Sequence, residues 1–141
     1  MRPTVAAALA DFAGKLRRDI VPQLAGFNAS NAGMMAEMLD MAAEQWDTAA
    51  DKLIGENVRL RDVVRRGAVM FPHVVNALPP QAGDWRVSSL QAENEALREM
   101  LIAVHVAVEL AHDDEAARLE ADIWAILRDG VEARRIVSAN F

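Results

Sequence analysis

Two histidines and a glutamate have the spacing of metal ligands on a helix. His105, Glu109 and His112 are separated by four and three residues, which places them on one face of an α-helix. Imidazole nitrogens and a carboxylate suit zinc or iron. Glu109 and His112 also have the Glu-x-x-His spacing of di-iron bundles, but the sequence holds no second such pair. The pattern is therefore compatible with a site for one divalent transition metal. The alternative, which we favour, is a polar strip beside the core and no cofactor.

Other chemistry has little support in the sequence. There is no cysteine, no glycine-rich phosphate loop and no Gly-x-Ser-x-Gly motif. Glu56, Glu93 and Glu95 flank the apolar positions of their segments, where a charge is usually solvated, whereas a general acid needs a desolvated carboxyl group. We therefore assign no catalytic residue and expect a protein that is not an enzyme.

Two long helices, at about residues 31–66 and 85–112, must position these side chains. In both segments apolar residues recur every three or four positions, which is the period of a helix. Each apolar stripe contains a single polar residue, Asn57 in the first and Asn94 in the second.

The two segments also share a short sequence motif. Residues 53–64 and 90–101 both place Leu, Glu-Asn, Leu-Arg and an apolar residue at the same offsets. If the helices fold back as an antiparallel hairpin, the numbers of facing residues add to about 151, a condition that Asn57 and Asn94 meet. A buried pair of amides satisfies its own hydrogen bonds and specifies register at some cost in stability. In a parallel homodimer, Asn57 would instead pair with Asn57 of a second copy.

Shorter helices complete the expected fold. Thr4 is placed to cap a first helix that Pro22 ends, and Asp113 or Asp114 is placed to cap a last one. The apolar connection between the two long helices predicts a short helix from Pro72 that covers the end of the bundle or a partner. We expect an all-α, up-and-down bundle of about four helices, forming a single domain over residues 1–141.

Composition narrows the possible partners. The net charge is −6, which disfavours nucleic acid, and the longest uncharged runs contain proline, asparagine and glycine, so they do not suit a membrane span. No signal peptide is recognisable at the N-terminus, and we expect a cytoplasmic protein.

The function expected from these features is non-enzymatic. The long central helices would project beyond the outer ones unless a second copy covers them, so we predict a self-associating, homodimeric accessory or interaction protein with an unknown protein partner. Methionines 34, 35, 38 and 41 would pack against the first helix or a second subunit. Two alternatives are a metal-binding bundle that uses His105, Glu109 and His112, and a bundle that holds a small apolar ligand among Met34, Met38, Trp46 and Phe71.

Overall fold

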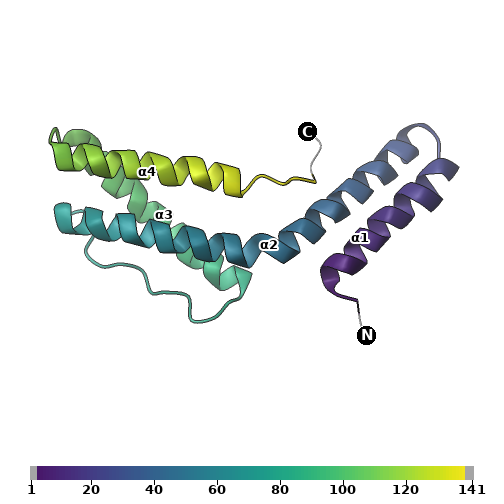
Figure 1. Ribbon diagram of the computed structural model, residues 1–141, viewed down its shortest axis with the longest axis horizontal. Helices are drawn as coiled ribbons and strands as arrows, with labels where there is room; N and C mark the ends of the chain where they lie inside the picture. Colours follow the sequence, from purple (N-terminus) through teal and green to yellow (C-terminus); the bar gives the residue numbers. More distant parts are fainter. Residues whose placement is uncertain (1–2, 139–141) are drawn as a thin grey trace. The chain divides into compact units, whose positions relative to one another are not determined.

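The protein is all-α, as the sequence predicts. The computed structural model describes residues 3–138, of which 79 % are helical, with no strand among them. Its four α-helices are α1 (Val5–Lys15), α2 (Gly26–Met70), α3 (Val87–Leu110) and α4 (Asp114–Ala133) (Figure 1). None of the helices in the described residues combines the length and the apolar character needed to cross a bilayer.

The chain divides into two compact units. Unit 1 contains the described residues up to Ala49 and those from Arg135 on, and unit 2 contains Ala50–Arg134. Helix α2 contributes its first half to unit 1 and its second half to unit 2. A single domain over residues 1–141 stays a prediction.

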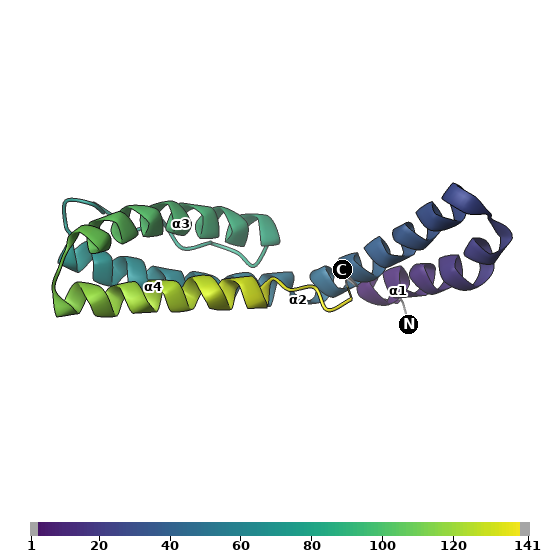
Figure 2. The ribbon, with the colours of Figure 1, turned by 90° about the horizontal axis from the view of Figure 1, so that it is seen from above.

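Unit 1 is a helical hairpin of α1 and the first half of α2 (Figure 2). The hydroxyl of Thr4 accepts a hydrogen bond from the Ala7 amide at 3.2 Å and caps α1. The chain continues through a π-helical turn (Leu16–Ile20) and a 3-10 turn (Val21–Gln23) that contains Pro22. Gly26 then begins α2 with φ of 57°, in the left-handed region that favours glycine.

Unit 2 is built from the second half of α2 with α3 and α4. Its core is formed by leucine, valine, isoleucine and alanine side chains from all three helices, with Val75 from the connection between α2 and α3. Asp113 caps α4 by accepting hydrogen bonds from the amides of Glu115 and Ala116.

In unit 2, α2 and α3 run parallel, and the predicted antiparallel hairpin is wrong. Asn57 contacts Asn94, and a Cβ atom placed on Gly67 would meet Val104, so facing residues differ by 37 at both places. In an antiparallel pair the difference would change along the helices. Figures 1 and 2 show the connection returning along the bundle from the end of α2 to the start of α3.

The connection is long enough for this return. At about 1.5 Å per residue, the part of α2 in unit 2 is about 30 Å long, whereas residues 71–86 in extended form reach about 50 Å. The expected helix at Pro72 is absent, because this segment forms turns, bends and irregular chain. Its apolar residues do cover the bundle, since Phe71, Val74 and Leu78 pack against the core.

Helix α4 is antiparallel to α2. Arg59 pairs with Asp129, and Arg66 pairs with Asp122, both at 2.7 Å. Residue numbers rise along one helix as they fall along the other. The short turn between α3 and α4 is sufficient for this reversal.

Candidate functional site

The two stripe asparagines lie together in the core of unit 2. Asn94 Nδ2 donates a hydrogen bond to Asn57 Oδ1 at 2.8 Å, and Asn57 Nδ2 donates to the carbonyl of Leu90 at 2.9 Å. Only 4 % of Asn57 and 1 % of Asn94 is exposed. The pairing expected from the sequence is therefore present, although in parallel helices. The shared sequence motif explains this contact, because two parallel helices in register bring equivalent positions of both segments face to face.

Two buried carboxylates flank this amide pair, contrary to the expectation that Glu56 and Glu93 are solvated. Arg61 of α2 binds Glu93 of α3, and Arg98 of α3 binds Glu56 of α2. The residues of the first pair differ from their counterparts in the second by the same 37 positions that separate Asn57 from Asn94. The side chains of Glu56 and Glu93 are 6 % and 5 % exposed, so both charges depend on their partners.

Further contacts complete the two ion pairs. Arg134, at the end of α4, binds Glu56 at 2.7 Å, so this carboxylate joins all three helices of unit 2. Glu93 accepts a hydrogen bond from the Ala82 amide at 2.9 Å, and Arg61 donates to the carbonyl of Pro79 at 2.8 Å. These two bonds hold the returning connection against α2 and α3.

The electrostatic environment keeps both glutamates ionised. Burial by itself raises the pKa of Glu56, but hydrogen bonds and charge from Arg98 and Arg134 together outweigh it and lower the pKa. Burial likewise acts to raise the pKa of Glu93, and the Ala82 amide, Arg61 and Asn57 together lower it. A general acid at neutral pH needs a raised pKa, so neither carboxyl group has this property.

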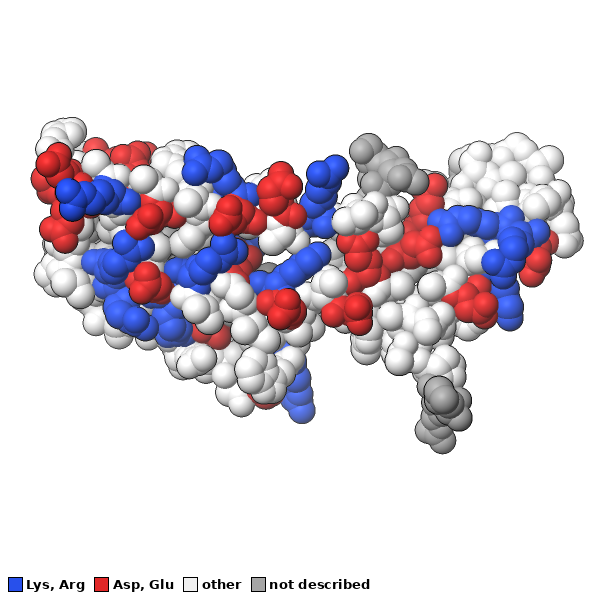
Figure 3. Space-filling model, in the orientation of Figure 1, with Lys and Arg blue, Asp and Glu red and all other residues white. Residues whose placement is uncertain are grey.

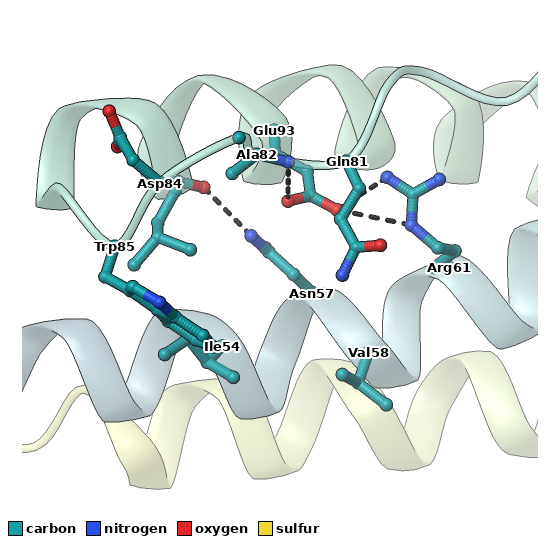
Figure 4. A pocket seen from close by; sticks show the side chains of 11 residues that line it. Ile54, Asn57, Val58, Arg61, Gln81, Ala82, Asp84, Trp85 and Glu93 are labelled. Atoms are coloured by element: carbon teal, nitrogen blue, oxygen red, sulfur yellow. Dashed lines mark hydrogen bonds and ion pairs between the residues drawn. The ribbon is translucent and has the colours of Figure 1, made fainter.

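A pocket of about 200 Å³ lies beside Glu93, between α2, the start of α3 and the connection (Figure 4). Three of its polar lining residues, Asn57, Arg61 and Glu93, are engaged in the hydrogen bonds described above. Trp85 forms one wall and is 75 % exposed. Pockets for drug-sized ligands usually measure about 300–1,000 Å³. These hydrogen bonds therefore hold the connection in place, and the pocket is smaller than is usual for a ligand site.

The three residues predicted as metal ligands do not all lie together in the structure. Helix α3 ends at Leu110, and Ala111 has extended backbone angles, so His112 leaves the helical face that carries His105 and Glu109. The helical spacing argument fails for His112 for this reason. Glu120 of α4 takes the third place, and the ligand atoms of His105, Glu109 and Glu120 all lie within 4.8 Å of one another.

The methionine segment is largely uncovered. Met34, Met35 and Met38 are 54 %, 58 % and 64 % exposed, and Trp46 is 65 % exposed. The hypothesis that Met34, Met38, Trp46 and Phe71 hold a small apolar ligand stays a prediction.

Sequence reasoning missed several residues of these sites. The shared sequence motif contained a signal for Arg61 and Arg98, which occupy equivalent positions in the two segments. Arg134 and Glu120 carried no such signal, because only the packing of α4 brings them to Glu56 and His105.

Comparisons with known proteins add no function to this geometry. No family model, no curated protein and no solved structure matches the chain.

Proposed function

We propose that the chain is a non-enzymatic helical protein that self-associates through unit 1 and serves as an accessory or interaction module in the cytoplasm. The observation that carries the proposal is an uncovered apolar stripe on the first half of α2. Phe27, Met34 and Met38 are separated by seven and four residues, so they share one helical face. Their exposed fractions are 78 %, 54 % and 64 %. Met35 and Trp46 widen the stripe.

Unit 1 has little core of its own to offset this exposure. Among its described residues, the buried apolar ones are three alanines, at positions 13, 32 and 36. Three apolar residues before α2 are also exposed, although their spacing is that of a buried stripe. Val5 and Phe12 of α1 are 45 % and 54 % exposed, and Ile20 of the π-helical turn is 44 % exposed. Units this small usually need oligomerisation, disulfides or metals for stability, and the sequence has no cysteine.

A second copy of the chain is the partner that we propose for this surface. The stripe contains no charged residue. Two such surfaces are therefore self-complementary, as a twofold dimer requires. Pairing of two hairpins would make a four-helix bundle with methionine in its centre, where its flexible side chain fills irregular space.

We further infer that α2 and α3 of unit 2 pack as a short parallel coiled coil. Buried asparagines at one matched position and crosswise Glu–Arg pairs beside them are the features that fix register and partner in such coils. Unit 2 then acts as the rigid part of the protein.

Light scattering and analytical ultracentrifugation of the full chain test the proposal. We expect a dimer for the natural sequence and a dissociation constant raised about 100-fold or more by Met38→Glu, because a twofold interface would bury two added charges. The matched control is Val131→Glu on α4 of unit 2, where the replaced side chain is 69 % exposed. This control should leave the dimer intact.

Other results contradict the proposal. A strictly monomeric chain at high concentration would overturn self-association. A dimer that Val131→Glu dissociates and Met38→Glu does not would place the interface on unit 2 instead.

A further inference from the structure

A buried ring nitrogen on α3 has no hydrogen-bonding partner among residues 3–138. Nε2 of His105 is inaccessible to solvent and makes no hydrogen bond. Its nearest charged neighbour is Glu109, one turn further along α3, with Oε1 at 3.7 Å, beyond hydrogen-bonding distance. Leaving such a group unpaired destabilises the folded state. Native proteins usually satisfy these atoms with a protein group, a water molecule or an ion.

The groups around this nitrogen are acidic. Glu120 of α4 brings a second carboxylate, and the three ligand atoms lie within 4.8 Å of one another. Among residues 3–138, neither Glu109 nor Glu120 forms an ion pair with lysine or arginine. Two neighbouring carboxylates repel each other unless a cation lies between them. A divalent ion would neutralise both and accept the lone pair of Nε2.

We propose that His105, Glu109 and Glu120 form a binding site for one divalent transition metal ion, with Zn²⁺ as the representative. Imidazole suits zinc, copper, iron and nickel, and carboxylates bind zinc at about 2.0–2.2 Å. Tetrahedral bonds of this length place two ligand atoms about 3.4 Å apart. The 3.7 Å between His105 and Glu109 is close to this value. Glu109 is 56 % exposed, so its side chain is free to make the remaining adjustment.

Helices α3 and α4 together position the imidazole of His105. His105 meets the indole ring of Trp124 edge to face, with 5.4 Å between ring centroids and an interplanar angle of 85°. His105 and Glu109 come from α3, whereas Glu120 and Trp124 come from α4. A bound ion would therefore tie the two helices together. Three ligands from the chain leave a coordination position for water or for a ligand from outside.

Calorimetric titration of chelator-treated full-length protein with Zn²⁺ tests this site. We expect one ion per chain and a higher melting temperature with Zn²⁺, because an ion that binds only the folded state stabilises it. His105→Gln and Glu120→Gln should each weaken binding at least 10-fold, since loss of even a supporting residue costs about 10–100-fold. Glu109→Gln, at an exposed position that should not disturb folding, provides a third test.

The matched control is His112→Asn. This histidine belongs to the set predicted from sequence but not to the site in the structure, so its replacement should leave Zn²⁺ affinity unchanged. A second reading comes from Trp124, whose fluorescence should be quenched by an open-shell ion such as Ni²⁺ in the natural sequence and not in Trp124→Phe.

Three outcomes overturn the proposal. These are the absence of stoichiometric Zn²⁺ binding, binding that is equal in all variants, and binding that depends on His112 but not on Glu120. None of these outcomes bears on self-association through unit 1.

Discussion

Glu56 shows how single residues stabilise unit 2. Its side chain is 6 % exposed, and its carboxylate forms ion pairs with two arginines, one from α3 and one from the end of α4. Arg98 and Arg134 keep part of their surface in water, at 33 % and 48 % exposure. The glutamate therefore bears most of the desolvation, and its pKa is lowered because the two arginines together outweigh that desolvation.

The lowered pKa of Glu56 gives a prediction about pH. A group whose pKa is lower in the folded state contributes stability that is present above its unfolded pKa, about 4.5, and is lost as pH falls through the folded value. We expect Glu56→Gln to lower the free energy of unfolding by about 1–3 kcal/mol at pH 7, and to reduce the loss of stability between pH 5 and the acid range. Urea denaturation at several pH values measures both effects.

The control for this prediction neutralises an exposed glutamate. Glu132→Gln on α4 should change neither the stability at pH 7 nor its dependence on pH by a comparable amount. An unchanged pH dependence in Glu56→Gln would mean that the ion pairs with Arg98 and Arg134 do not contribute to stability.

At the scale of the elements, the parallel register of α2 and α3 depends on close approach as well as on polar pairs. Gly67 lies opposite Val104, and an added Cβ atom would lie 2.7 Å from Val104 Cγ2 and nearer still to Cγ1. Val104 is fully buried and β-branched, so it has little freedom to move in a helix. Glycine is therefore required here for packing, even though it weakens the helix.

Gly55 provides a matched comparison in the same helix. A Cβ atom at Gly55 would meet nothing within 4 Å. We expect Gly55→Ala to stabilise the protein by up to about 1 kcal/mol through helix propensity. Gly67→Ala should instead destabilise it by about 1–3 kcal/mol through overpacking. Thermal and urea denaturation compare the two, and a stabilising Gly67→Ala would show that α2 and α3 do not approach closely at this position.

At the scale of the whole molecule, the two units differ in how much of their apolar surface they bury themselves. The core cluster of unit 2 is formed entirely by residues between Leu60 and Leu127, with ion pairs from the same unit around it (Figure 3). In the described part of unit 1, three alanines are buried and larger apolar side chains are exposed. Stability and association are thus expected to reside in different parts of the chain.

Expression of residues 50–134 alone tests this division. We expect this fragment to be helical by circular dichroism, to unfold in one cooperative transition and to sediment as a monomer, because it contains its complete core and lacks the apolar stripe of α2. The full chain is the control and should sediment as a dimer. A fragment that is unfolded would show that unit 2 requires unit 1 for stability, and a dimeric fragment would place the interface elsewhere.

The sequence by itself determined what depends on local spacing. Helical period fixed the all-α class, the cap at Thr4 and the stripes that bring Asn57 and Asn94 into the core. The sequence motif shared by the two segments also implied that Asn57 and Asn94 meet, because equivalent stripes pack on each other. It did not reveal direction, since one matched pair satisfies both a parallel and an antiparallel arrangement.

Only the tertiary structure decided the direction of α3, the burial of Glu56 and the replacement of His112 by Glu120. Each depends on contacts between segments far apart in the chain, whose free energy local periodicity does not contain. The extended connection at residues 71–86 permits the parallel return, and Arg134 reaches Glu56 from 78 residues away. The end of α3 at Leu110 removes His112 from its helical face, while the packing of α4 brings Glu120 to His105.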